Sequence, residues 1–269
     1  FDGVQCPCIL LQLIATGKPL STAGMMIEDR ICTYTIAMER TVVPENFSFR
    51  MTDEEYRVLE KIKNSIPVCY LADHADFALG IVTGNNKKFL SAEKTENSEM
   101  VLKGTDICKY HINPVKQYLR FEPEQFQQVA PLEIYRAPEK LLYRFISNQL
   151  VVAYDDRQML SLNSCNIVIP KIDGMQIKYI LAILNSSVSQ FVYQKEFHSI
   201  KVLRAHMEHI PIPRVGKAIQ NEIIAMTEPL ICGMGKEAAE TCQKRLDCRI
   251  MDLFRLSAEE QWIIRHALH

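Results

Sequence analysis

The stretch that decides the fold is KLLYRFISNQLVVAYDDRQMLSLNSCNIVIP, residues 140–170. It contains four short runs of apolar, β-branched and aromatic residues, and the turn-forming pairs Asn148-Gln149 and Asp155-Asp156 separate three of them. Such runs predict a meander of antiparallel strands. The same pattern of short apolar runs broken by turn residues extends back to about Val68, so we expect a β-rich core for this part of the chain.

Helical patterns flank the β-rich part. Apolar residues at three- and four-residue spacing predict helices over residues 175–184, 188–197, 218–230, 237–253 and 257–267. Ser257 and Glu260 form a capping-box pattern at the start of the last helix. A second such pattern, Thr52-Asp53-Glu54-Glu55, predicts a helix from about Thr52 to Asn64.

The N-terminal part carries two apolar runs, residues 8–14 and 31–38, separated by a polar stretch that contains glycine. These runs predict two strands of a hairpin-like unit. A strand that starts almost at Phe1 is expected when a chain begins inside a larger protein. The predicted fold class is α+β, with a mixed or antiparallel β-rich domain followed by a helical C-terminal tail.

Composition narrows the class of protein. With 269 residues and 48% hydrophobic residues, the chain can form one large domain or two modest ones. The sequence contains no apolar run of about 18 residues and no basic signal-peptide start, so we expect a cytoplasmic protein without a membrane partner. The net charge of -1 argues against indiscriminate phosphate binding, but residues 80–214 hold 17 Lys and Arg against 13 Asp and Glu.

Common catalytic signatures are missing from the sequence. We find no GxGxxG after a strand, no GxxxxGK[ST], no HExxH and no GxSxG. The nine cysteines are scattered, and the close pair Cys6 and Cys8 has no second Cys or His pair at ligand spacing, so no metal is expected. A stand-alone enzyme built on His206 or His209 is the least favoured hypothesis. We therefore expect no catalytic residues in this chain.

Seven blocks, in order, carry a resemblance to a known family. They are GIVTGNNKKF (80–89), VLKGTDI (101–107), RAPEKLLYR (136–144), VAYDD (152–156), LSLNS (160–164), YILAILNS (179–186) and IPIP (210–213). Together these blocks resemble the TaqI-like C-terminal specificity domain of type II restriction-modification DNA adenine-N6 methyltransferases, some of which are fused to a restriction endonuclease. The order of the blocks is more specific than any one of them.

The resemblance implies a domain organisation and a function. Residues 68–214 would be a target-recognition domain that reads a short sequence of double-stranded DNA and presents an adenine for flipping. Residues 1–45 would be the last strands of the methyltransferase catalytic domain, 46–67 a linker helix and 215–269 a helical tail. The family's FxGxG-type loop and (N/D)PP(Y/F) tetrapeptide are absent. S-adenosylmethionine is therefore expected only in a missing catalytic domain, which would be a partner.

Five candidate DNA contacts lie in one block. Residues 80–89 are expected to form a strand, a tight turn and a short strand, with a loop tip that carries Thr83, Asn85, Asn86, Lys87 and Lys88. Asn can pair with adenine, and Lys can contact guanine or phosphate. A solvated turn that needs Gly and Asn for its backbone conformation is the alternative.

Five further candidates are Lys103, Arg136, Lys140, Arg144 and Asn163. Lys103 opens a KGTD turn, in which we expect Asp106 to be a turn or cap residue rather than a base contact. For the next three residues, phosphate contact competes with ordinary surface charge or an ion pair with Asp155. Asn163 can instead bond the backbone.

A function of another class also fits the sequence. The acidic ends and the helical tail would suit a protein-interaction scaffold that holds a nuclease or methyltransferase. Replacing Lys87 and Lys88 separates the two hypotheses, because DNA binding should weaken only if the chain is a recognition module.

Overall fold

The computed structural model describes residues 24–28, 33–38, 40, 51–197 and 199–268, and the chain divides into two units, residues 1–53 and 54–269. In the first unit, β1 (Met25–Glu28) pairs antiparallel with β2 (Thr33–Ile36). β2 falls within a predicted strand, but β1 occupies the predicted connection, because Gly24 at φ +85 lets the Met-Met-Ile run pair locally. The other predicted strand, 8–14, lies outside the described residues.

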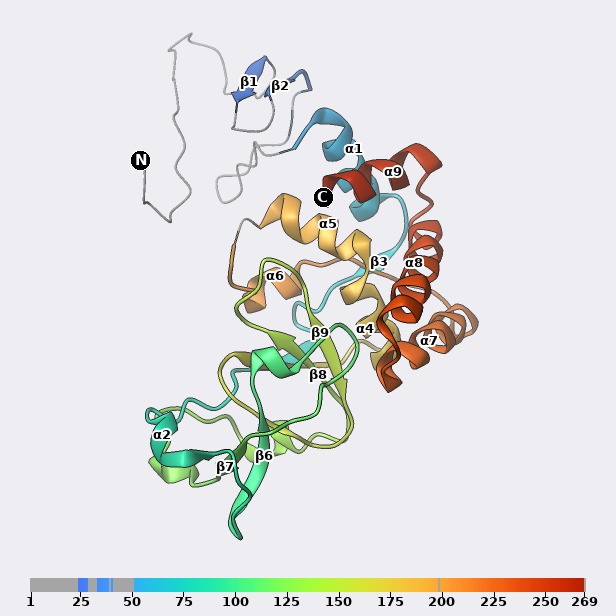
Figure 1. The fold of residues 1–269 in the computed structure, drawn as a ribbon. Helices are drawn as coiled ribbons and strands as arrows, with labels where there is room; N and C mark the ends of the chain where they lie inside the picture. Colours follow the sequence, from blue (N-terminus) through green and yellow to red (C-terminus); the bar gives the residue numbers. More distant parts are fainter. Residues whose placement is uncertain (1–23, 29–32, 39, 41–50, 198, 269) are drawn as a thin grey trace. The chain divides into compact units, whose positions relative to one another are not determined.

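The central sheet of the second unit has the strand order β4-β11-β8-β9 and is antiparallel throughout. Its strands are β4 (Ala75–Ala78), β8 (Lys140–Arg144), β9 (Val152–Asp155) and β11 (Cys165–Pro170). Ile167 lies opposite both Ala78 and Leu142, and Leu142 lies opposite Ala153, so these residues share one face. The strands predicted in residues 140–170 are present, and β8 and β9 can be followed in Figure 1.

A smaller sheet has the order β10-β6-β7-β5, formed by β5 (Leu90–Ser91), β6 (Ser98–Leu102), β7 (Tyr118–Arg120) and β10 (Leu160–Ser161). β10 pairs parallel with β6. The predicted meander is therefore wrong at this point, because the chain leaves the central sheet after β9, crosses to the second sheet and returns as β11. Two bridges extend the smaller sheet, Ile81 parallel to Leu162 and Val82 antiparallel to Gln128.

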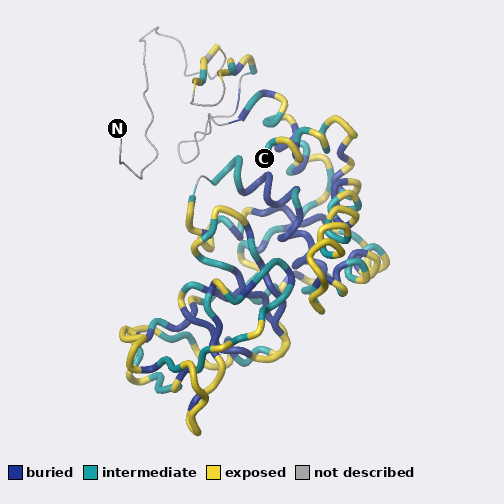
Figure 2. The backbone as a smooth tube through the Cα atoms, viewed as in Figure 1, coloured by how far each residue is buried: buried dark blue, intermediate teal, exposed yellow. Residues whose placement is uncertain are grey.

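The core of this β-rich part lies between the two sheets. Buried side chains from both sheets form one cluster: Ile81, Phe89, Val101, Leu102, Ile107, Leu119, Tyr135, Leu142, Ala153, Met159, Leu160, Leu162, Cys165 and Ile167. Full burial of one such aliphatic or aromatic side chain stabilises a fold by about 1.5–3 kcal/mol. Figure 2 shows buried segments through the middle of the unit and exposed ones at its rim.

The helices confirm the α+β class. They are α1 (Asp53–Asn64), α2 (Asn86–Phe89), α3 (Leu132–Tyr135), α4 (Ile177–Asn185), α5 (Ser187–Glu196), α6 (Arg204–Glu208), α7 (Lys217–Cys232), α8 (Lys236–Leu253) and α9 (Ala258–Ala267), with short 3-10 turns at Gly104–Asp106 and Pro123–Gln125. α4 packs on β8, β9 and α7, and α5 packs on α8 and α9. Two short strands, β3 (Val68–Cys69) and β12 (Ile212–Pro213), pair antiparallel. The capping box at α9 is confirmed, because Ser257 and Glu260 exchange hydrogen bonds.

Within the described ranges, the helices are all too short or too polar to cross a membrane.

A buried ion pair joins β8 and β9, which are consecutive strands and form a hairpin. Lys140 and Asp155 lie opposite each other in register and are both fully buried, with Lys140 Nζ 2.5 Å from Asp155 Oδ2. Lys140 also donates to the carbonyl of Tyr135. Burial lowers the pKa of Lys140, and the Asp155 carboxylate opposes that shift. The hypothesis that Lys140 contacts phosphate is therefore wrong, because its ammonium has no surface through which DNA could reach it.

Replacing Lys140 should destabilise the fold strongly. Lys140→Met leaves the Asp155 carboxylate buried without a cation, so we expect the free energy of unfolding to fall by about 3–5 kcal/mol in urea denaturation followed by circular dichroism. The matched control is Lys171→Met, which breaks the exposed Lys171–Asp76 pair and should cost less than about 1 kcal/mol. Equal losses in the two variants would contradict the structural role of the buried pair.

Candidate nucleic-acid interface

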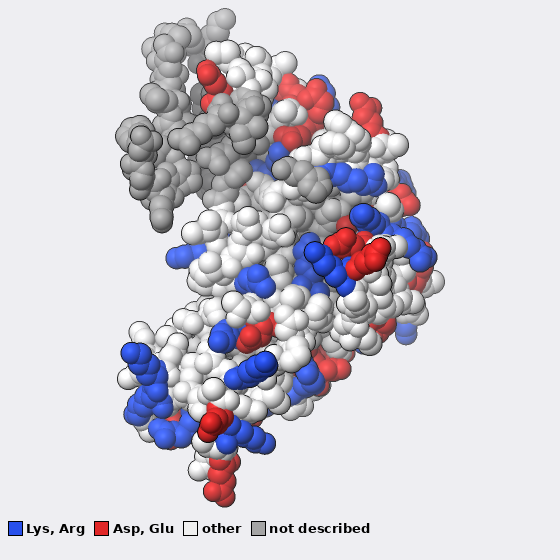
Figure 3. All heavy atoms as spheres, in the orientation of Figure 1, with Lys and Arg blue, Asp and Glu red and all other residues white. Residues whose placement is uncertain are grey.

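Exposed amide and lysine side chains gather at one end of the smaller sheet. We call this the α2 cluster, and we include the buried Thr83 in it: Thr83, Asn85, Asn86, Lys87 and Lys88 come from one segment, and Gln125, Gln127 and Gln128 come from another. Val82 and Gln128 exchange both backbone hydrogen bonds, at 2.8 and 3.0 Å, and Lys88 Nζ donates to Gln125 Oε1 at 2.6 Å. Figure 3 shows Lys and Arg side chains over this end of the unit.

The turn of the α2 cluster differs from the predicted strand-turn-strand. Asn86–Phe89 is one helical turn, because the Asn85 side chain accepts from the N–H of Lys88 and starts a helix where a strand was expected. Thr83 is buried, and its hydroxyl donates to Asn86 Oδ1. Gly84 has φ +74, as a turn that needs glycine requires. Asn85 and Asn86 thus shape the turn while both residues remain exposed.

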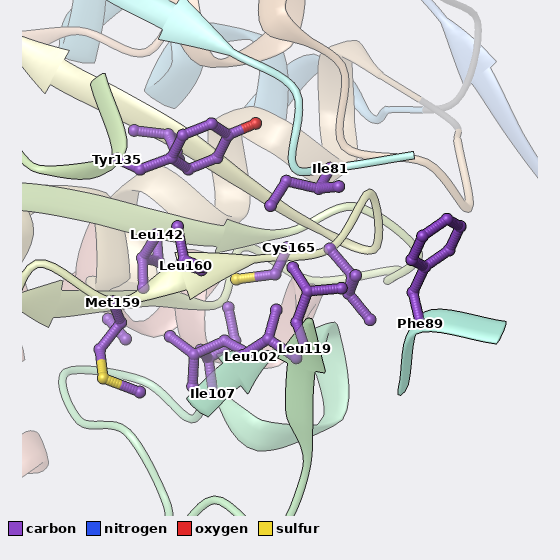
Figure 4. Packing of buried hydrophobic residues seen from close by; sticks show 14 residues of the cluster. Ile81, Phe89, Leu102, Ile107, Leu119, Tyr135, Leu142, Met159, Leu160 and Cys165 are labelled. Atoms are coloured by element: carbon purple, nitrogen blue, oxygen red, sulfur yellow. The ribbon is translucent and has the colours of Figure 1, made fainter. Parts of the chain in front are cut away.

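Phe89 anchors α2 in the core. Its ring is one of the buried side chains of the core cluster (Figure 4). It lies edge-on to Phe126, with 5.2 Å between the ring centroids. Lys88 Nζ lies 4.8 Å from the centroid of the Phe89 ring, and the Arg120 guanidinium lies 5.9 Å from it. Lys87 is exposed, and no residue in the described part of the chain forms an ion pair with it. The buried Phe89 ring therefore fixes α2 on the core, while the Lys87 and Lys88 side chains stay exposed.

Two more predicted residues follow the ends of β6 and β10. The N–H of Asn163 donates to the carbonyl of Ile81, which places the exposed Asn163 beside the segment that leads to Thr83. Lys103 precedes Gly104, whose N–H donates to Ser164 Oγ. Asp106 accepts from the N–H of Lys103, the turn role expected for it.

The structure does not bring Arg136 and Arg144 into the α2 cluster. Arg144 donates to the carbonyls of Gly104 and Ile107 at 2.9 and 2.6 Å, rather than to Asp155. Arg136 donates to Glu99 at 2.6 Å and to the carbonyl of Gln158 at 2.8 Å, next to the start of β10 rather than its end. Both side chains thus form hydrogen bonds within the fold: Arg144 donates to backbone carbonyls, and Arg136 donates to a carbonyl and a carboxylate.

The three glutamines of the α2 cluster were not among the site residues predicted from the sequence. Gln125, Gln127 and Gln128 are exposed, and an added Cβ at Gly84 would lie 3.4 Å from Gln127 Cβ. Their segment, PEQFQQ, lies about 40 residues from Asn85 in sequence and carries no motif. Its enrichment in amides was the available signal, but its pairing with Val82 depends on tertiary structure.

His206 and His209 form local contacts. His206 stacks on Phe197 with 4.5 Å between ring centroids, and its Nδ1 accepts from the N–H of Leu203. Burial lowers the pKa of His206, and the nearby His209 adds to that shift. Within the residues that the structure describes, no three His, Cys, Asp or Glu side chains are placed to hold a metal ion. Cys6 and Cys8 lie outside that part.

Residues 99–212 match the family model described as the TaqI-like C-terminal specificity domain. Over this range the chain is similar to TaqI-like specificity domains. The matched range runs from within β6 to within β12 and includes Lys103, Arg136, Arg144, Asn163 and the three glutamines of the α2 cluster. The segment with Thr83 to Lys88 precedes the matched range and packs on it through the Val82–Gln128 pairing.

Solved structures of restriction-modification proteins are similar to this chain. The type IIL restriction-modification enzyme MmeI in complex with DNA is similar at TM-score 0.51 and 12% identity, over 74% of this chain and 35% of that one. The type IIG restriction endonuclease BpuSI gives 0.46 and 13%, over 81% and 32%. The HsdS subunit from Thermoanaerobacter tengcongensis gives 0.41 and 15%, over 80% and 50%. The chain thus spans half or less of each of these proteins. A search of curated proteins finds no match.

Gly80 fixes the segment that carries the α2 cluster. A Cβ at Gly80 would lie 2.1 Å from the carbonyl oxygen of Leu162, so Gly80→Ala should push residues 80–82 away from residues 162–165. We expect the free energy of unfolding to fall by about 1–3 kcal/mol in chemical denaturation. Gly216→Ala is the control, because a Cβ there meets nothing within 4 Å. If Gly80→Ala behaves like the control, the close approach does not fix this segment.

Proposed function

We propose that this chain is the sequence-specific DNA-binding module of a restriction-modification DNA adenine-N6 methyltransferase, and that the α2 cluster contacts the target. The observation that carries the proposal is the exposed set of Asn, Gln and Lys side chains on a fixed turn at one end of a specificity-domain fold. Asn and Gln amides can bond both N6 and N7 of adenine, and Lys can bond guanine or phosphate.

The charge distribution supports separate roles for the two residue types. The whole chain has a net charge of -1, so its affinity for DNA depends on local cations rather than on the overall field. Lys87 and Lys88 would neutralise phosphates and fix the register on the duplex. Asn85, Asn86, Gln127 and Gln128 are exposed and uncharged, which suits the reading of base edges.

The proposal includes two partners beyond this chain's own residues. Adenine methylation needs S-adenosylmethionine and a catalytic domain that receives the flipped base. We propose that both belong to the catalytic part of the enzyme, which an endonuclease can accompany. The module would supply target choice to that part. The protein-interaction scaffold is the competing function.

Removing the two lysines of α2 should weaken DNA binding. We expect Lys87→Ala/Lys88→Ala to bind a labelled duplex less tightly in fluorescence anisotropy, and to reduce the salt slope of log K by roughly 0.9 per lost phosphate contact. Lys236→Ala/Lys244→Ala, at exposed positions of α8, is the matched control. The same affinity and slope in both variants, or no duplex binding by the parent chain at low salt, would favour the scaffold.

Removing the glutamine amides should change the preferred sequence. Selection of randomised duplexes by the parent chain should enrich a short motif that contains adenine. In Gln127→Ala/Gln128→Ala the preference should relax at one or two base pairs, by about 1–3 kcal/mol each, with little change in binding to unselected DNA. Gln149→Ala removes an exposed amide outside the α2 cluster and should keep the motif. An unchanged motif in the double variant argues against base reading by these amides.

A further inference from the structure

A second surface feature has the properties of a ligand site. A pocket of about 310 Å³ opens on the smaller sheet, between β6, β7 and the turn before β10. Met100, Tyr118 and Met159 give it an apolar lining, and Lys94, Arg136 and Arg157 bring positive charge. Its volume is at the lower end of the range of about 300–1,000 Å³ for small-molecule sites. The α2 cluster contributes no residue to it.

The charges of the pocket do not cancel. Glu99, its one carboxylate among the lining residues, lies 2.6 Å from the Arg136 guanidinium. Lys94 and Arg157 are exposed, and the described residues place no carboxylate within 4.0 Å of either cation. Two positive charges are therefore available to an anion beside an apolar and aromatic surface.

The rim of the pocket is fixed before any ligand arrives. The buried Asp155 carboxylate accepts from the N–H groups of Arg157 and Met159, both at 2.9 Å. Between them, Gln158 adopts φ +56, a conformation rare for a residue other than glycine, and its carbonyl accepts from Arg136. Strained residues of this kind persist where the surrounding contacts hold them, and they concentrate at functional sites.

We propose that this pocket binds one nucleotide, with the phosphate between Lys94 and Arg157 and the base against Tyr118 and Met100. A phosphate matches the two unpaired cations, and a planar base matches an aromatic ring beside a flexible thioether. The apolar lining favours a nucleotide over inorganic phosphate, and the cations favour it over a nucleoside. The nucleotide can be free or can belong to an unpaired stretch of a DNA strand. The site does not depend on the function proposed for the α2 cluster.

Titration calorimetry with the full chain at low salt tests the site. We expect dAMP to bind more tightly than either deoxyadenosine or inorganic phosphate. Lys94→Gln/Arg157→Gln should weaken dAMP binding at least tenfold and bring it close to that of deoxyadenosine. Lys236→Gln/Arg245→Gln, which removes the same two charge types from exposed positions of α8, should leave it unchanged. Tyr118→Ser, checked for folding by its thermal transition, should weaken dAMP and deoxyadenosine binding but not that of phosphate.

Two results would overturn the proposal: no binding of dAMP by the parent chain, or equal dAMP affinity in the parent chain and in Lys94→Gln/Arg157→Gln. Competition distinguishes the sources of the nucleotide. Displacement of dAMP by a duplex with a single-stranded extension, but not by a blunt duplex, supports a strand ligand, and retention of dAMP supports a free nucleotide. Lys87→Ala/Lys88→Ala should bind dAMP as the parent chain does. A wrong DNA-binding role for the α2 cluster and a wrong nucleotide site in this pocket can therefore be distinguished.

Discussion

The rest of the β-rich part depends on the buried ion pair between Lys140 and Asp155. Two charges removed from water are costly unless their remaining hydrogen-bonding positions are filled. Here the ammonium also donates to Tyr135, and the carboxylate also accepts two N–H groups of the following turn. The pair thus determines where the chain leaves the central sheet, and from that point β10 reaches β6. Pairing of Leu162 with Ile81 then positions the segment that carries the α2 cluster.

A second set of polar contacts joins the loop between β6 and β7 to the central sheet. Arg144 donates to two of its carbonyls, and Tyr110, at φ +76, exchanges backbone hydrogen bonds with Val152 and Tyr154 at the β9 edge. Lys109 donates to the carbonyl of Asn185 in α4. Some basic residues of the β-rich part therefore stabilise the fold, and others contribute positive charge to the surface. The sequence alone does not distinguish an arginine that donates to backbone carbonyls from one that contacts phosphate. The adjacent residues do not show which partner the side chain will have.

Periodicity and turn chemistry were enough to predict the class, the strands from 140 to 170 and the C-terminal helices, because these are local patterns. The register of the hairpin was not within reach, because a two-residue turn at Asn148-Gln149 would set Lys140 opposite Arg157, whereas Lys140 lies opposite Asp155. The parallel pairing of β10 was also out of reach, since it depends on contacts about 60 residues apart. Within the site, Asn85 as a cap overrode the strand pattern, and the glutamines joined it only through tertiary pairing.

The separation of buried from exposed polar residues has a consequence for how target choice can change. Lys140, Asp155 and Arg144 are satisfied by partners inside the fold, so substitutions there alter stability before they alter any contact with DNA. Gln127 and Gln128 are exposed, and surface substitutions of this kind usually shift stability by no more than about 0.5 kcal/mol. If these amides read bases, the preferred sequence can vary at little cost to the fold. That division between a fixed frame and replaceable reading residues is what a specificity domain requires.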